Sequence, residues 1–76
     1  MVLKANVGRI VHYVAYGTPG GEYKPAHRAA IVTDVNSDGT VLGLCVLNPT
    51  GMFFNTTVNE DQTGQKGGTW HWPERD

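Results

Sequence analysis

The chain has 76 residues, with six Lys and Arg against seven Asp and Glu, and therefore a formal net charge of -1. This length holds one small domain, residues 1–76, and no second one. The near-neutral charge argues against a strong non-specific binder of DNA or RNA and against an acidic nucleic-acid mimic. No apolar stretch approaches the roughly 20 residues that cross a bilayer, so we expect no membrane partner.

Strands are predicted on both sides of a long loop in the first half of the chain. Residues 7–16, VGRIVHYVAY, are rich in β-branched and aromatic side chains and mostly alternate, which is typical of a strand. Residues 17–25, GTPGGEYKP, contain three glycines and two prolines and predict a loop. A second strand is expected over 27–35, HRAAIVTDV.

A tight turn follows the second strand. In NSDG, residues 36–39, the Asn and Asp side chains bond to their own backbone, and Gly39 accommodates positive φ. The next residues, TVLGLCVLN over 40–48, again read as a strand. The two strands therefore form a predicted hairpin.

A second tight turn starts the last third of the chain. In NPTG, residues 48–51, proline presets φ for the second position of a type I turn. A fourth strand is predicted over 52–58, MFFNTTV, and a polar, Gly-rich loop over 59–68. A short fifth strand, GTWHW, ends before Pro73.

Five short strands without a helical period predict an all-β fold. We expect a small, partly open, five-stranded SH3-like barrel, with an OB-like barrel as the alternative. The loop order favours the SH3-like form, because one long loop comes first and two tight turns follow. In the last strand, alternation sends Trp70 and Trp72 to one face and His71 to the other.

Both faces of the third strand are apolar, which a single small barrel does not need. One face carries Leu42, Leu44 and Val46, and the other carries Val41, Gly43, Cys45 and Leu47. A barrel has one interior, so the second face needs a cover. We therefore expect a homo-oligomer.

The lone cysteine and the first residues indicate a compartment. Cys45 is the only cysteine and lies in the apolar run VLGLCVL, where a thiol behaves as a small buried hydrophobic group. The start, MVLKANVGR, has no long apolar segment of the kind that a secretory signal requires. Both features predict a cytoplasmic protein.

Three histidines are the candidate metal ligands, with Glu74 or Asp34 as a fourth. Zinc sites are usually marked by ligands paired closely along the chain. His12, His27 and His71 lie 15 and 44 positions apart, read from their places in the sequence. On this spacing we expect no metal and no other cofactor.

Catalysis is not indicated by the side chains that usually carry it. Cys45 lies mid-strand and Ser37 lies in a turn, so neither has a base beside it in sequence. The neighbouring carboxylates Glu60 and Asp61 lie in a solvated loop and do not flank a bond as glycosidase carboxylates do. We expect a protein that is not an enzyme.

Four segments resemble small uncharacterised proteins encoded by bacteriophages of actinobacteria-type hosts. They are VGRIVHYV, PAHRAAIVTDV, LNPTGMFF and GGTWHWPE. The closing GTWHWPE and the HRAAIVT segment carry most of the resemblance, which spans nearly the whole chain. It implies expression in the cytoplasm of an infected bacterium. Phage proteins of this size include inhibitors of host defence that sequester a nucleotide messenger without cleaving it.

The leading hypothesis is therefore a non-catalytic protein that sequesters a small nucleotide-like or other anionic ligand. A tryptophan would stack on a base, and arginine and histidine would contact phosphate or ribose. The GTPGG loop would close over the ligand, and polar groups near the NPTG turn would add hydrogen bonds. The candidate ligand-binding residues are Tyr23, His27, Arg28, Asn48, Thr50, Trp70, His71 and Trp72.

Two alternatives belong to other functional classes. The first is a protein-interaction or virion module whose aromatic C-terminal segment docks on a phage or host protein. The second is a nucleic-acid-binding barrel, against which the net charge of -1 speaks.

Overall fold

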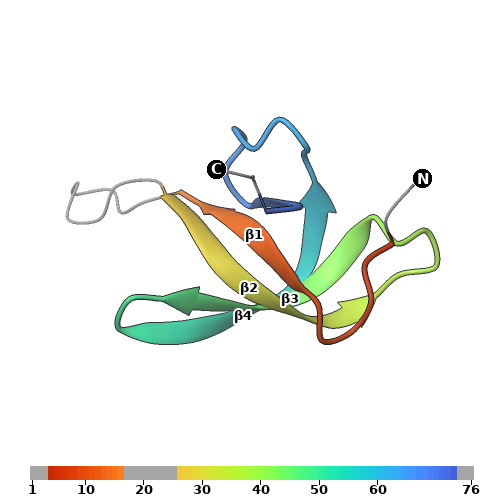
Figure 1. Ribbon diagram of the computed structural model, residues 1–76, viewed down its shortest axis with the longest axis horizontal. Coiled ribbons are helices and arrows are strands. Elements are labelled where there is room, and N and C mark those ends of the chain that lie inside the picture. The colour runs from red at the N-terminus through yellow and green to blue at the C-terminus, as the bar shows by residue number, and fades with distance from the viewer. Residues whose placement is uncertain (1–3, 17–25, 74–76) are drawn as a thin grey trace.

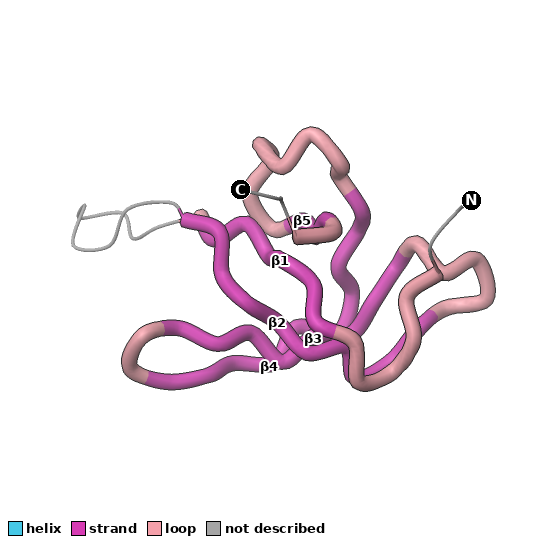
Figure 2. Tube along the Cα trace, viewed as in Figure 1, coloured by secondary structure: helices cyan, strands magenta, loops and turns pink. Residues whose placement is uncertain are grey.

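The computed structural model describes residues 4–16 and 26–73, which form five strands and no helix. The strands close into a barrel in the order β1-β2-β3-β4-β5 (Figures 1 and 2). The predicted all-β fold of five strands is confirmed, and the barrel is closed where the sequence predicted a partly open one. The strand bounds are β1 Ile10–Ala15, β2 Ala26–Val35, β3 Val41–Asn48, β4 Gly51–Glu60 and β5 Thr69–His71.

Each strand pairs with the next along the chain, which differs from the Greek-key order of an OB fold. The pairs are antiparallel except for β4 with β5, which is parallel. Strand β5 closes the barrel through two register pairs with β1 and two with β4. Closure therefore depends on a short strand at the C-terminal end of the chain.

Strand β1 begins three residues later than the sequence pattern predicts. The backbone N–H of Arg9 donates to the carbonyl oxygen of Asn6 at 3.1 Å, which closes a turn. Gly8 lies in this turn with φ of 95°, a conformation that glycine adopts without steric cost. Val7 is consequently exposed and lies outside β1.

Both predicted tight turns are present. In the first, Oδ1 of Asn36 accepts the backbone N–H groups of Thr40 at 3.1 Å and Val41 at 3.2 Å. Gly39 has φ of 76°, as the NSDG pattern requires. In the second, Asn48 pairs with Gly51 across a two-residue turn.

The inner faces of the strands form one hydrophobic core. Its fully buried side chains are Val11, Val32, Leu42, Leu44, Val46, Val58 and Trp70. Trp70 is 1% exposed, and its Nε1 donates to the carbonyl oxygen of Thr40 at 2.9 Å. Trp72 packs edge-on against Trp70, with ring centroids 5.7 Å apart. The two tryptophans thus dock the closing strand, and both lie on the core side as the alternation predicts.

The outer face of the sheet is also apolar over part of its area. The register places Ile10, Ile31, Cys45 and Phe54 in one row across β1 to β4. Ile10 is 49% exposed and Phe54 is 68% exposed. The expected second apolar face therefore exists.

The described part of the chain holds no helix long and apolar enough to span a bilayer.

Candidate metal centre

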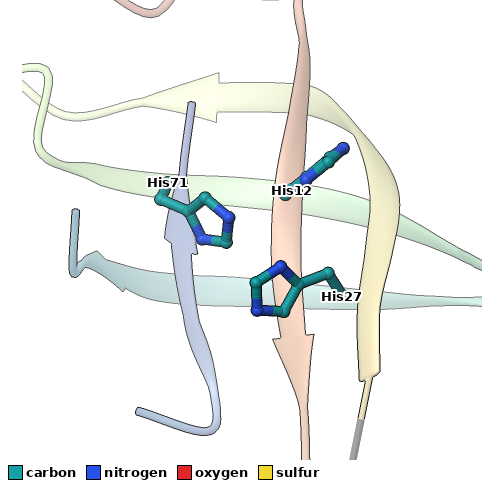
Figure 3. Close-up of side chains that lie close together, drawn as sticks. All are labelled: His12, His27 and His71. Atoms are coloured by element: carbon teal, nitrogen blue, oxygen red, sulfur yellow. The ribbon is translucent and has the colours of Figure 1, made fainter. Parts of the chain in front are cut away.

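Strand pairing brings all three histidines of the chain together on the outer face of the barrel (Figure 3). His12 on β1 and His71 on β5 are direct register partners. His27 on β2 pairs with Val14, two residues beyond His12 and on the same face. Each histidine therefore comes from a different strand, and the closing strand supplies one of them.

The three imidazole rings are close enough to share one ion. One ring nitrogen from each of His12, His27 and His71 lies within 4.8 Å of the other two. The centroids are 4.7 Å apart for His27 and His71, 5.5 Å for His12 and His71, and 6.2 Å for His12 and His27. Among the described residues, no other group of histidine, cysteine or carboxylate side chains converges in this way.

The loop between β4 and β5, residues 61–68, covers the cluster from outside. Its start is fixed to β5 by the backbone N–H of Asp61, which donates to the carbonyl oxygen of Trp70 at 2.9 Å. Its end is fixed to β1 by the N–H of Gly68, which donates to Val14 at 2.8 Å. His71 is 2% exposed as a result, although it lies on the outer face. His12 is half-buried and His27 is exposed, so the cluster opens to solvent on the β2 side.

Gly64 in this loop forms a hydrogen bond with one of the rings. Its carbonyl oxygen lies 2.8 Å from Nε2 of His27. A carbonyl oxygen only accepts, so Nε2 donates, and the lone pair of a neutral His27 ring is on Nδ1. Metal-bound histidines commonly donate their second ring N–H to a backbone carbonyl in this way.

Asp61 holds the loop in shape. Its carboxylate accepts the hydroxyl of Thr63 at 2.6 Å and the backbone N–H groups of Thr63 at 3.1 Å and Lys66 at 3.0 Å. The hydrogen bond from the Thr63 hydroxyl, followed by that from the Lys66 N–H, lowers the pKa of Asp61 below its ordinary value of 3.8. The negative charge of Asp61 therefore stabilises hydrogen bonds within the loop.

Three imidazoles form a donor set for borderline divalent metals such as Zn²⁺, Co²⁺, Ni²⁺ and Cu²⁺. Around a tetrahedral zinc ion with bonds of about 2.0–2.1 Å, neighbouring nitrogens lie roughly 3.4 Å apart. The cluster must therefore contract by about 1.4 Å at most from its 4.8 Å limit. The two longest ring separations both involve His12. Rotation of the half-buried His12 ring supplies a movement of this size, while the His27 ring keeps its contact with Gly64.

The sequence argument against a metal site rested on wide spacing along the chain, and that argument fails here. Antiparallel pairing makes residues 12 and 71 neighbours. Asp34 and Glu74, the two candidates for a fourth ligand, are not part of the described cluster. Asp34 lies seven residues from His27 along β2, a span of about 23 Å, and Glu74 is outside the described residues.

Of the predicted ligand-binding residues that the structure describes, two lie in the histidine cluster, His27 and His71. Arg28 pairs with the core residue Tyr13 and so lies on the opposite face of β2 from His27. Trp70 is enclosed in the core and presents no face on which a base can stack. Trp72 is half-buried, with the guanidinium of Arg9 5.4 Å from its ring centroid.

The other predicted ligand-binding residues are not at the histidines. Asn48 and Thr50 lie at the tip of the β3–β4 hairpin, which projects away from β5 in Figure 2. Tyr23 and the GTPGG segment are outside the described residues. His12 was considered only as a metal ligand, and its direct pairing with His71 is the feature that the sequence does not reveal.

Comparison of the chain with protein-family models, with curated proteins and with solved structures gave no significant match.

Proposed function

We propose that the protein binds one divalent transition-metal ion, with zinc as the first candidate, through His12, His27 and His71. The observation that carries this proposal is the convergence of three ring nitrogens within 4.8 Å, from three strands. The contact between His27 and the carbonyl oxygen of Gly64 adds the orienting partner that metal-binding histidines use.

The proposed metal ion would also offer a position to an anionic ligand. Neutral imidazoles leave the full charge of the ion uncompensated, and the cluster contains no carboxylate from the described residues. With three protein ligands, zinc keeps a position for water or an anion. A nucleotide-like ligand held by its phosphate at such an ion stays a prediction, as do the phage origin, the cytoplasmic location and the absence of catalysis.

Calorimetry on protein without a histidine tag tests the metal proposal. Titration with ZnCl₂ should give one ion per chain with a Kd of about 1 µM or tighter. His12→Gln and His27→Gln each remove one ligand from a side chain that is not fully buried. Each should weaken zinc binding by more than about 100-fold, because loss of a ligand costs more than loss of its orienting partner.

Cys45→Ala is the matched control, because Cys45 is the only cysteine of the chain and lies in the outer row with Ile10 and Ile31, outside the histidine cluster. This variant should bind zinc as the parent protein does. Zinc binding that survives both histidine substitutions, or no zinc binding by the folded parent protein, would contradict the proposal. Repeating the titration of the zinc-loaded protein with phosphate and with linear and cyclic nucleotides tests the anion separately.

A further inference from the structure

One edge of β4 is open at the β3–β4 hairpin. Strand β4 pairs with β3 from Gly51 onward, whereas it pairs with β5 only at Asn59 and Glu60. In an antiparallel strand, alternate residues direct their N–H and C=O groups away from the paired neighbour. Toward Val58 the register shifts, and Asn55 Oδ1 accepts the Thr57 N–H at 3.2 Å. The open edge in the described structure is therefore residues 51–55.

This edge lacks the charges and the proline that often protect a strand from pairing with another chain. Natural edges carry lysine, proline or inward charges. The segment GMFFN over 51–55 contains no charge and no proline. Met52 is 64% exposed and Phe54 is 68% exposed. Such an edge presents unpaired backbone groups that are a template for another strand.

An apolar surface leads directly to the open edge. The outer row runs from Ile10 to Phe54. Leu47 and Met52 form the neighbouring pair on the same face, and they are 39% and 64% exposed. The row Ile10, Ile31, Cys45 and Phe54 contains no charged residue. A partner that pairs with the edge also extends this apolar surface.

We propose that the occupant is a second copy of this chain, with residues 51–55 of the two copies paired antiparallel across a two-fold axis. Antiparallel pairing of an uncharged segment with itself places no like charges opposite each other. A two-fold contact is self-complementary and closes, so it leaves no open edge for further growth. The apolar rows of the two copies then join into one surface at the axis. This inference is independent of the metal site.

The area that such a dimer must bury is a small part of the molecule. A standard interface buries about 800 Å² from each partner, about one seventh of the 5270 Å² surface of the chain. The protruding hairpin presents side chains on both faces, with Met52 and Phe54 on one face and the 37% exposed Phe53 on the other. Both faces contribute to a contact between two hairpins.

Sedimentation equilibrium over a range of protein concentrations tests the proposal. The parent protein should reach twice the 8.3 kDa mass of the chain, with and without EDTA. Phe54→Lys places a charge on the edge and should raise the dimer Kd at least tenfold. Val7→Lys is the matched control, because Val7 is 66% exposed but lies outside the hairpin, and it should dimerise as the parent does. Circular dichroism and Tm establish that both variants fold.

Three results would overturn the inference. They are a monomer at every concentration, a dimer that folded Phe54→Lys forms as tightly as the parent, and a dimer that EDTA dissolves. The last would be an assembly bridged by metal, and it would leave the metal proposal standing while removing this one.

Discussion

Trp70 is the largest fully buried side chain among the described residues. Its ring fills the core, and its Nε1 hydrogen bond to Thr40 ties β5 to the start of β3. Trp70 therefore stabilises the closed barrel by holding β5 against the core. The half-buried Trp72 packs against Trp70, so the two neighbouring tryptophans both contribute to docking β5.

Trp70→Ala should lower the free energy of unfolding by about 3–5 kcal/mol, the usual cost of removing a buried tryptophan. Trp72→Ala should cost clearly less, because Trp72 is only half-buried. Urea denaturation followed by far-UV circular dichroism measures both losses. Equal losses, or a smaller loss for Trp70→Ala, would mean that Trp70 does not have the role described above.

Gly64 is the residue on which the cover of the histidines depends. It has φ of 69°, in the left-handed region that favours glycine. An added Cβ would lie 3.3 Å from Cε1 of His71 and 3.4 Å from Cε1 of His27. The position therefore requires glycine for its backbone conformation and for the space it leaves to two rings.

Gly64→Ala should weaken zinc binding about tenfold, because a strain of about 1–2 kcal/mol falls on the loop and both rings. Gly39→Ala provides the control. Gly39 has a similar φ of 76°, but an added Cβ there meets nothing within 4 Å. Gly39→Ala should lower the free energy of unfolding about as much as Gly64→Ala does and should leave the zinc affinity unchanged. Equal zinc affinities of the two variants, measured by calorimetry, would contradict the assigned role of Gly64.

At the scale of elements, the loop over 61–68 is the part that turns an outer strand face into an enclosed site. Asp61 fixes its shape through Thr63 and Lys66. Because the pKa of Asp61 is lower in the folded protein, ionised Asp61 stabilises the folded loop above its unfolded pKa of 3.8. That stabilisation is lost as the pH falls through the lowered folded value.

The backbone amides of Thr63 and Lys66 should therefore keep their NMR shifts down to about pH 4 and move only below it. In Asp61→Asn, the same amides should show no titration in this range. The control variant is Asp38→Asn, which changes a residue in the exposed NSDG turn. In this variant the amide shifts of Thr63 and Lys66 should depend on pH as they do in the parent protein. Movement of the Thr63 and Lys66 amides with a midpoint above 3.8 would show that the carboxylate is not stabilised as described.

For the whole molecule, the strands and turns could be predicted from local patterns. Alternation in VLGLCVL, the turn chemistry of NSDG and NPTG, and the opposite faces of Trp70 and His71 are all properties of neighbouring residues. They sufficed for an all-β barrel that β5 closes. Local patterns also predicted the excess apolar face that now appears as the outer row ending at Phe54.

The histidine cluster could not be predicted in the same way. It depends on the register between β1 and β5, which joins residues 12 and 71, and on a loop that folds back over β5. Neither follows from spacing along the chain. Burial of Trp70 likewise depends on barrel closure, so the sequence left open which tryptophan lies in the core and which is accessible.

The most direct test of the metal site is long-range ¹H–¹⁵N NMR of the histidine rings in tag-free protein during a zinc titration. The chain contains three histidines, so every ring signal can be followed. We expect all three rings to shift together and the change to be complete at one equivalent of zinc. Shifts confined to one ring, or rings that do not respond to zinc, would contradict a shared metal centre of His12, His27 and His71.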